Sequence, residues 1–307
     1  MEGKTRLWRD PAPFDYARLM ERVEALAFRF PTLGVGFLGS SILGRGIPIL
    51  TVGRGEREVL YVGAHHGMEW ITSLVLMGFL QDLCDSLEHR GNILGTEPSR
   101  FLDRYTLLLI PMLNPDGVEY QIHGVTPENP LYERVVGMNG GLDFSAWQAN
   151  ARGVDLNHNY DAGFEEYKRL EAEEGIKGGR TRYSGECAES EPEVAYLCNR
   201  IRFSKRLFGI LTLHTQGEEI FYRSGGRTVE GSERIARRLG ALTGYQLSEA
   251  QGLASYGGLT DWCVQKIGIP SFTLECGKGV NPLPQSQAFS IYARLREALF
   301  AFPTLLG

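Results

Sequence analysis

The stretch Gly63–Ile71 reads GAHHGMEWI and stands between two apolar segments of different character. The segment before it is short and β-like, and the segment after it is long and apolar on one face, which predicts a strand, a turn and a helix. His66 and Glu69 are three residues apart, so on the first helical turn both side chains can point at one ion. An imidazole and a carboxylate suit zinc if a third ligand comes from elsewhere and a fourth position stays open for water. The spacing alone is weak evidence, because chance and salt bridges also produce it.

The rest of the chain alternates between β-like and helical segments, as in α/β proteins. Strands are predicted at 35–43, 47–52, 59–63, 105–111, 207–214 and 271–275, and helices at 15–30, 69–87, 230–242, 260–266 and 285–302, with another opening at Ser190. Short glycine turns separate the first three strands, so we expect these to be adjacent and antiparallel. The Gly- and Pro-rich stretch 116–153 is expected to be irregular and to wall a cleft. The length is ordinary for one α/β domain, and a single domain over residues 1–307 is expected.

Composition and charge narrow the possible partners. The formal net charge of -5 and the pI near 5.8 do not indicate the excess of positive charge that nucleic-acid binding requires. No window approaches about 18 uninterrupted apolar residues, and the N-terminal charges have no apolar stretch behind them. The five cysteines are scattered, with no Cys-x-x-Cys pair. We therefore expect a cytoplasmic protein with free thiols and with no nucleic-acid or membrane partner.

Further segments follow the first motif in a recurring order. They are NPDG at 114–117, GVDLN at 153–157, LTLH at 211–214, GGLTDW at 257–262 and SFTLE at 271–275. Together with the first motif, they resemble the zinc carboxypeptidase family over roughly residues 60 to 276. The resemblance implies a mixed central sheet with helices on both faces and one Zn²⁺ per chain, held by His66, Glu69 and His214. His214 closes a predicted strand, which would hold an imidazole rigidly.

The same resemblance assigns roles to three polar residues. Glu275 ends an apolar strand, where it could take a proton from water and hand it to the leaving nitrogen. Asp155 stands where the family places the carboxylate that orients the first histidine. Asn157 matches the asparagine that binds substrate, since its amide can donate and accept. A surface salt bridge for Glu275 and ordinary turn positions for Asp155 and Asn157 are the alternatives.

Other positions depart from the digestive members of the family. His158 stands where an arginine would grip the substrate's terminal carboxylate, and a neutral histidine offers no such fork. Gln148 occupies the position of the arginine that polarises the scissile carbonyl, so Arg152 becomes the nearest candidate, with a solvent-facing loop arginine as the alternative. The family tyrosine is replaced by Leu253. The remaining expected substrate contacts are Tyr256, nearby, and Thr260, at the floor of the pocket.

These departures resemble one branch of the family, the γ-D-glutamyl-meso-diaminopimelate peptidases that cut peptidoglycan stem peptides. The stretch Asn139–Asn157 and the HTQGEE stretch at 214–219 carry that likeness. Diaminopimelate brings a carboxylate and an ammonium group, so a polar pocket is needed. Arg180 and Arg182 could bind stem-peptide carboxylates, although solvated loop arginines are common. The expected substrate is a cell-wall peptide, trimmed inside the cell during recycling or spore formation.

Three other functions compete with this interpretation. A zinc deacylase of N-acyl amino acids would share the His-Gly-x-Glu motif, but the segments 257–262 and 271–275 favour a peptidase because they build its substrate pocket. A general carboxypeptidase would share the metal site but would need a carboxylate-binding arginine. A non-catalytic binding protein of the same fold is disfavoured because all three metal ligands and Glu275 are present.

Overall fold

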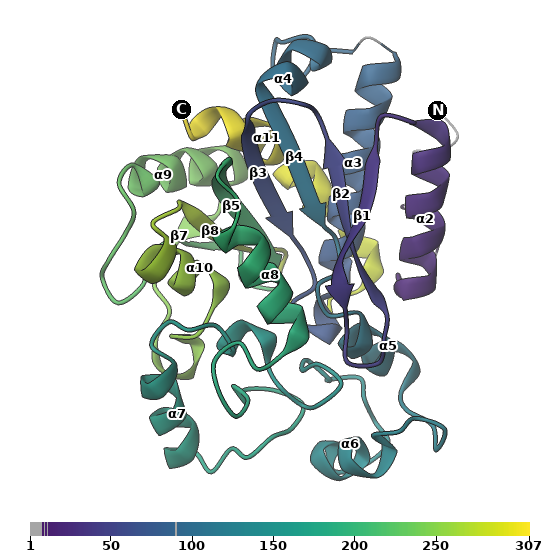
Figure 1. The fold of residues 1–307 in the computed structure, drawn as a ribbon, viewed down its shortest axis with the longest axis vertical. Coiled ribbons are helices and arrows are strands. Elements are labelled where there is room, and N and C mark those ends of the chain that lie inside the picture. The colour runs from purple at the N-terminus through teal and green to yellow at the C-terminus, as the bar shows by residue number, and fades with distance from the viewer. Residues whose placement is uncertain (1–7, 9, 11, 90) are drawn as a thin grey trace.

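The computed structural model describes residues 8, 10, 12–89 and 91–307 and contains one eight-stranded mixed sheet (Figure 1). The strands are β1 (Gly34–Ser40), β2 (Gly46–Val52), β3 (Arg57–Val62), β4 (Tyr105–Ile110), β5 (Leu207–His214), β6 (Glu219–Phe221), β7 (Gln246–Leu247) and β8 (Ser271–Glu275), in the order β1-β2-β4-β3-β5-β8-β6-β7. The four central strands, β4, β3, β5 and β8, are parallel to one another. The expected α/β class with a mixed central sheet is confirmed.

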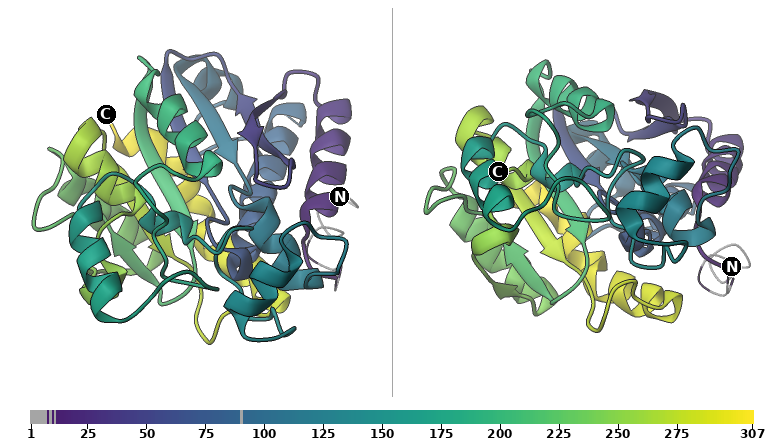
Figure 2. Two further views of the ribbon diagram at one scale, coloured as in Figure 1. Left: turned by 60° about the horizontal axis from the view of Figure 1, so that its bottom comes forward. Right: turned by 90° about the horizontal axis from the view of Figure 1, so that it is seen from below.

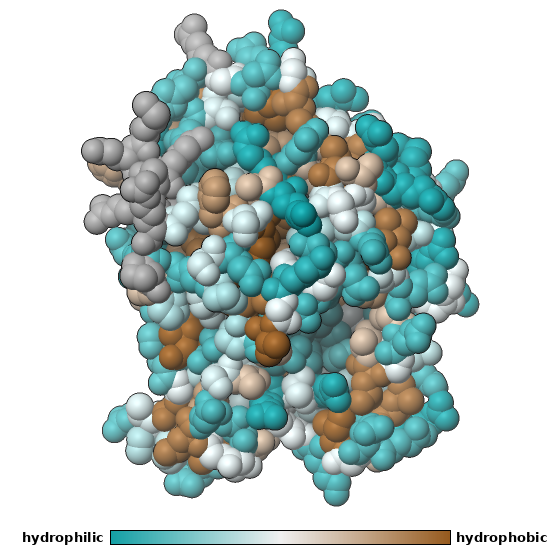
Figure 3. Space-filling view, turned by 180° about the vertical axis from the view of Figure 1, so that it is seen from behind, coloured by the Kyte–Doolittle hydropathy of each residue, from teal (hydrophilic) through white to brown (hydrophobic). Residues whose placement is uncertain are grey.

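Helices cover both faces of the sheet, because alternate side chains of its central strands are apolar on either side. The helices are α2 (Tyr16–Arg29), α3 (Ile71–Glu88), α4 (Pro98–Arg104), α5 (Pro115–His123), α6 (Tyr132–Asn139), α7 (Phe164–Glu173), α8 (Pro192–Arg202), α9 (Ser232–Thr243), α10 (Leu259–Trp262) and α11 (Ala288–Leu305). Val59 and Tyr61 of β3 belong to the core shared with α2, α3, α9 and α11, whereas Leu60 and Val62 face α8 and α10. The outer surface behind the sheet is mainly hydrophilic, with small scattered apolar patches (Figure 3).

The prediction that the first three strands are adjacent is wrong. β1 and β2 do pair in antiparallel fashion, but β4 lies between β2 and β3. The glycine turn after β2 closes no hairpin, because the backbone N–H groups of Arg54 and Gly55 donate to the carbonyl of Leu102 at the end of α4. β3 instead pairs in parallel with β4 after the crossover through α3 and α4.

The stretch 116–153 is more ordered than predicted, since it contains most of α5 and all of α6. Asn114 caps α5 by accepting from the N–H of Gly117, and Pro115 occupies the first turn. A small core of its own, including Tyr120, Phe144 and Trp147, supports the rest of this stretch. The segment 260–266 is also less regular than predicted, because α10 ends at Trp262 and continues as a π-helical turn. Sequence patterns missed α4, α7, β6 and β7.

The central parallel strands end at the same edge of the sheet, where ligands bind in open α/β folds. His214 and Glu275 are register partners at the ends of β5 and β8. The loop that carries His66 follows β3, and the segment between α5 and α8 lies across this edge (Figures 1 and 2). The fold thus gathers residues from distant parts of the chain at one place.

All five cysteines are free thiols, and only Cys187 is exposed. Within the described residues, no helix is both long enough and apolar enough to cross a membrane.

Buried carboxylates anchor the stretch before Asp155 to the start of α8. Glu191 Oε2 accepts from Asn150 Nδ2 at 2.6 Å and pairs with Arg152 at 3.0 Å. Glu193 is completely buried, and its carboxyl group makes long contacts, at 3.4 Å, to the N–H of Ile42 and to Asn150. Burial raises the pKa of Glu193 to about 8, and the nearby carboxylates of the cluster act in the same direction. Glu193 therefore stays protonated in the folded chain at neutral pH.

This protonation predicts a pH-dependent stability. Between pH 5 and 8 the unfolded chain loses the Glu193 proton while the folded chain keeps it, so stability falls with rising pH by up to about 1.4 kcal/mol per pH unit. Glu193→Gln cannot ionise, and its free energy of unfolding should fall less over this window. Urea unfolding at pH 5, 6.5 and 8, at constant zinc, measures the difference, with the exposed Glu230→Gln as the charge-matched control. Equal pH dependence in the Glu193 variant and the unmodified chain would refute the assignment.

Candidate active site

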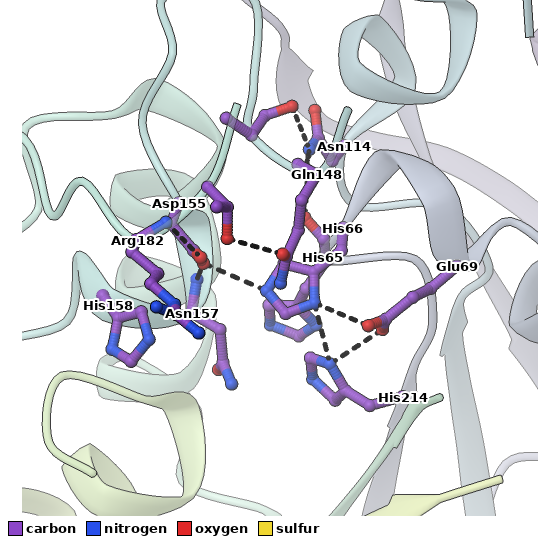
Figure 4. A network of polar contacts seen from close by, with 12 residues as sticks. His65, His66, Glu69, Asn114, Gln148, Asp155, Asn157, His158, Arg182 and His214 are labelled. Atoms are coloured by element: carbon purple, nitrogen blue, oxygen red, sulfur yellow. Dashed lines mark hydrogen bonds and ion pairs between the residues drawn. The ribbon is translucent and has the colours of Figure 1, made fainter. Parts of the chain in front are cut away.

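His66, Glu69 and His214 meet at the carboxyl edge of the sheet (Figure 4). His66 Nδ1 lies 3.0 Å from Glu69 Oε1, and His214 Nδ1 lies 3.0 Å from Glu69 Oε2. The two Nδ1 atoms are 3.3 Å apart. All three residues are buried. Three potential metal donors thus converge from the loop after β3, the short turn Gly67–Glu69 and the end of β5.

Asp155 determines which nitrogen of His66 faces this centre. Asp155 Oδ1 lies 3.0 Å from His66 Nε2, on the side of the ring away from Glu69. A carboxylate only accepts hydrogen bonds, so Nε2 carries the proton. In the neutral ring, Nδ1 then carries a lone pair. Asp155 itself is fixed by the backbone N–H groups of Asn157 and Arg182, each at 3.1 Å. The carboxylate therefore orients the imidazole toward the centre.

The donor set fits a cation. The lone pair on His66 Nδ1 lies 3.0 Å from the carboxylate oxygen Oε1 of Glu69. The two groups repel each other unless a proton or a metal ion lies between them. Burial opposes charge on His66, yet the Glu69 and Asp155 carboxylates hold its pKa well above the usual value. Burial likewise disfavours ionised Glu69, but both histidines lower its pKa to about 2. Two nitrogens and one carboxylate are a donor set that zinc takes, with a fourth position left open.

Neighbouring residues fix His214 and the loop after β3. The His65 ring stacks on His214 with centroids 4.9 Å apart and contacts the Tyr160 hydroxyl at 3.0 Å. The Asn114 side chain donates to the carbonyl of His65 at 3.0 Å and to that of Ala149 at 3.1 Å. Gly67 is needed in this loop because a Cβ there would lie 2.3 Å from the carbonyl oxygen of Gly117.

A cavity of about 660 Å³ opens beside the three converging residues. Glu275 lines it from the end of β8. Burial, reinforced by the Glu69 carboxylate, raises the pKa of Glu275 well above its usual range. Most residues of the remaining wall are polar, with Met68, Ala146, Leu253 and Ala254 as its apolar members; the polar ones are Gln148, Asp155, Asn157, His158, Arg180, Thr181, Arg182, Thr215, Gln251 and Asn281. The cavity is suited to a polar ligand.

Asn157 and His158 reach this cavity, but each has one group occupied by the protein. Asn157 Oδ1 accepts from the N–H of Leu259 at 3.2 Å, which leaves its Nδ2 group as a donor. His158 Nδ1 donates to the carbonyl of Tyr256 at 2.9 Å, and its ring stacks on Tyr167 with centroids 4.1 Å apart. The neutral His158 ring then offers only the Nε2 lone pair.

Three of the expected site residues are not brought to the cavity. The Arg152 guanidinium binds Glu191 and the carbonyl of Ser190, so it is held away from the centre. The buried Thr260 hydroxyl lies 2.9 Å from that of Thr273. Tyr256 lines a separate pocket of about 120 Å³. Arg152 and Thr260 are held by these hydrogen-bond partners, and Tyr256 belongs to the neighbouring pocket.

Several residues that line the cavity were not among the predicted contacts, and three of them are Gln148, Thr215 and Asn281. Gln148, a departure from the family pattern, lines the cavity, and its Oε1 accepts from the Thr181 hydroxyl at 2.6 Å, which leaves its amide Nε2 group available as a donor. Thr215 directly follows His214, and its hydroxyl donates to Asn281 Oδ1 at 2.7 Å. The position of Thr215 was a usable signal, whereas nothing in the local sequence marks Asn281.

Comparisons with known proteins agree with this geometry. A family model described as zinc carboxypeptidase matches residues 19–294. Gamma-D-glutamyl-L-diamino acid endopeptidase 1 of Lysinibacillus sphaericus is 33% identical over 291 residues, which cover 94% of this chain and 71% of that protein. The uncharacterized protein YqgT of Bacillus subtilis is 30% identical over 285 residues, which cover 91% of this chain and 74% of that protein.

The fold also matches solved structures. Bovine thrombin-activatable fibrinolysis inhibitor, in complex with tick carboxypeptidase inhibitor, aligns with a TM-score of 0.71 at 20% identity, covering 95% of this chain and 96% of that one. This likeness concerns the fold. The family match over most of the sequence, joined to the converging His66, Glu69 and His214, shows that the chain belongs to the zinc carboxypeptidase family and is a metallopeptidase.

Proposed function

We propose that this metallopeptidase hydrolyses peptidoglycan stem peptides at the γ-D-glutamyl-meso-diaminopimelate bond. The observation that carries the proposal is the polar cavity beside the metal-ligand set, with basic side chains on its wall. Stem peptides bring several carboxylates and an ammonium group, which such a wall can solvate. The relative from Lysinibacillus sphaericus, whose name states the same type of bond, supports this substrate class.

His66, Glu69 and His214 would hold the zinc ion, and Asp155 would keep the His66 ring in its binding orientation. When bound, zinc supplies Lewis-acid chemistry, lowering the pKa of water toward about 7 and polarising a carbonyl. The Glu275 carboxylate takes a proton from the attacking water and passes it to the leaving nitrogen. Its buried position suits both steps, because burial disfavours the charged form and makes the carboxylate a stronger base.

Gln148, rather than Arg152, is the candidate donor to the scissile carbonyl. Gln148 lines the cavity with its Nε2 group available, whereas Arg152 is bound to Glu191. An amide donor carries no full charge, so it stabilises the developing oxyanion less than an arginine would. Asn157 contributes a second amide donor on the same wall.

General carboxypeptidase activity is disfavoured by the environment of His158. An arginine at this position could grip a terminal carboxylate through two parallel hydrogen bonds. His158 has its Nδ1 proton bound to Tyr256 and its ring stacked on Tyr167. In the neutral form it offers the substrate an acceptor rather than a donor.

Mass spectrometry of a stem-peptide digest tests the proposed bond. L-Ala-γ-D-Glu-meso-diaminopimelyl-D-Ala should yield L-Ala-D-Glu and diaminopimelyl-D-Ala. Glu275→Gln should keep its zinc but lose about 10²- to 10⁴-fold in kcat, because only the proton carrier is removed. Release of D-Ala alone, or faster turnover of N-acyl amino acids than of stem peptides, would contradict the proposal. Undiminished kcat in Glu275→Gln would remove that residue from the mechanism.

Paired variants separate the roles of Gln148 and Arg152. Gln148→Ala should lower kcat by up to about 10²-fold if its amide stabilises the oxyanion. Arg152→Ala should leave kcat nearly unchanged but reduce the free energy of unfolding by about 1–3 kcal/mol, because buried Glu191 loses its partner. Steady-state kinetics and urea unfolding measure these two effects. Thr181→Val is the control for Gln148→Ala, because it removes the hydroxyl bond to Gln148 but keeps the Gln148 amide. A large kcat loss in Arg152→Ala would reverse the assignment.

A further inference from the structure

We propose that Arg180 and Arg182 form a carboxylate-binding subsite, taking over the substrate contact that His158 cannot make. This inference rests on the proposed function and names which part of the substrate the cavity recognises. The ligand is a free carboxylate of a peptide held in the cavity. Two sources share that chemistry: the α-carboxylate of the γ-linked D-glutamate and the distal carboxylate of diaminopimelate.

Both arginines line the cavity. The pKa of the exposed Asp143 is lowered mainly by hydrogen bonds from Ser145, and the charge of Arg180 adds to this effect from a distance. Among the described residues, neither guanidinium has a carboxylate oxygen within ion-pair distance, whereas Arg45 pairs with Asp116 at 2.7 Å and Arg152 with Glu191 at 3.0 Å. The surface elsewhere is rich in such pairs, including Arg296 with Asp82. Two exposed cations left unpaired on one cavity wall are available for an anionic ligand.

The backbone that carries these arginines is fixed on both sides. The carbonyl of Arg180 accepts from the N–H groups of Gln148 and Ala149, each at 2.9 Å. The N–H of Arg182 donates to Asp155 Oδ2 at 3.1 Å, and its carbonyl accepts from the Tyr167 hydroxyl at 3.0 Å. These bonds join the arginine segment directly to the carboxylate that orients His66. The two guanidinium groups therefore extend from a backbone segment that is held in place by hydrogen bonds.

The conformation of Arg182 is unusual and supports the same conclusion. Its φ is +65°, in the left-handed region that is strained for a residue other than glycine. Such strained residues persist where surrounding contacts hold them, and they cluster at ligand sites. Arg182 lies next to Asn157 and His158 in Figure 4. The Asn157 Nδ2 donor and the Arg182 guanidinium thus belong to the same part of the wall.

The chemistry of recognition follows from these donors. A guanidinium binds a carboxylate through two parallel hydrogen bonds, which fix its orientation as well as its charge. Glu275 and Asp155 also line the cavity, so a substrate carboxylate entering it needs nearby positive charge to offset their repulsion. Arg180 and Arg182 provide that charge.

Kinetics on three tripeptides test the subsite and identify the carboxylate. The peptides are L-Ala-γ-D-Glu-meso-diaminopimelate, its analogue amidated at the glutamate α-carboxyl, and its analogue amidated at the distal diaminopimelate carboxyl. Arg180→Gln and Arg182→Gln should each lower kcat/KM on the unmodified peptide by roughly tenfold to hundredfold, mainly through KM. On the analogue that lacks the recognised carboxylate, the variants should match the unmodified protein within about twofold.

Lys177→Gln is the matched control, because it removes one positive charge from the same exposed segment but does not line the cavity. If both arginine variants behave like Lys177→Gln on all three peptides, the subsite is refuted while the proposed function stands. If the unmodified protein cleaves none of them, the proposed function fails, and calorimetric titration with the same peptides decides about the subsite. Equal affinities of the unmodified and arginine-variant proteins, or no binding at all, would overturn it.

Discussion

The buried side chain of Asn114 fixes the edge of the sheet at which the whole site is assembled. Its amide donates to the carbonyls of His65 and Ala149, and its oxygen accepts from the N–H of Gly117 at 2.9 Å. It thereby joins the loop after β3, the start of α5 and the cavity wall. A buried polar group bonded on every side resists displacement, because each lost partner leaves an unsatisfied group away from water. The metal-ligand loop is consequently held before any ion binds.

The electrostatics of the site extend this constraint to function. Asp155 orients the His66 ring so that its lone pair points toward the Glu69 carboxylate. The carboxylates of Asp155 and Glu69 thus lie beside two histidine rings in a buried centre. Such an arrangement is unfavourable without a cation and favourable with one. The segment that binds Asp155 also presents the cavity arginines, so metal-site geometry and substrate recognition are parts of one hydrogen-bonded structure.

Much of the architecture and of the metal site could be predicted from local sequence, and the rest depends on distant partners. His66 and Glu69 share one turn, and His214 and Glu275 end apolar strands, so their meeting follows from parallel strand ends. Arg152 was predicted to polarise the substrate carbonyl, and its pairing with Glu191 could not be foreseen because Glu191 lies far along the chain. The pairing of β3 with β4 rather than β2 is likewise a long-range choice that short turns do not reveal.

The zinc content of the purified chain is the most direct test of the central claim that His66, Glu69 and His214 form a metal site. Elemental analysis after purification without chelator should find about one zinc per chain. His214→Ala should lose most of that zinc while keeping its far-ultraviolet circular dichroism, because one of three donors is removed from an otherwise supported fold. A zinc-free chain, or unchanged zinc in His214→Ala, would contradict the assignment.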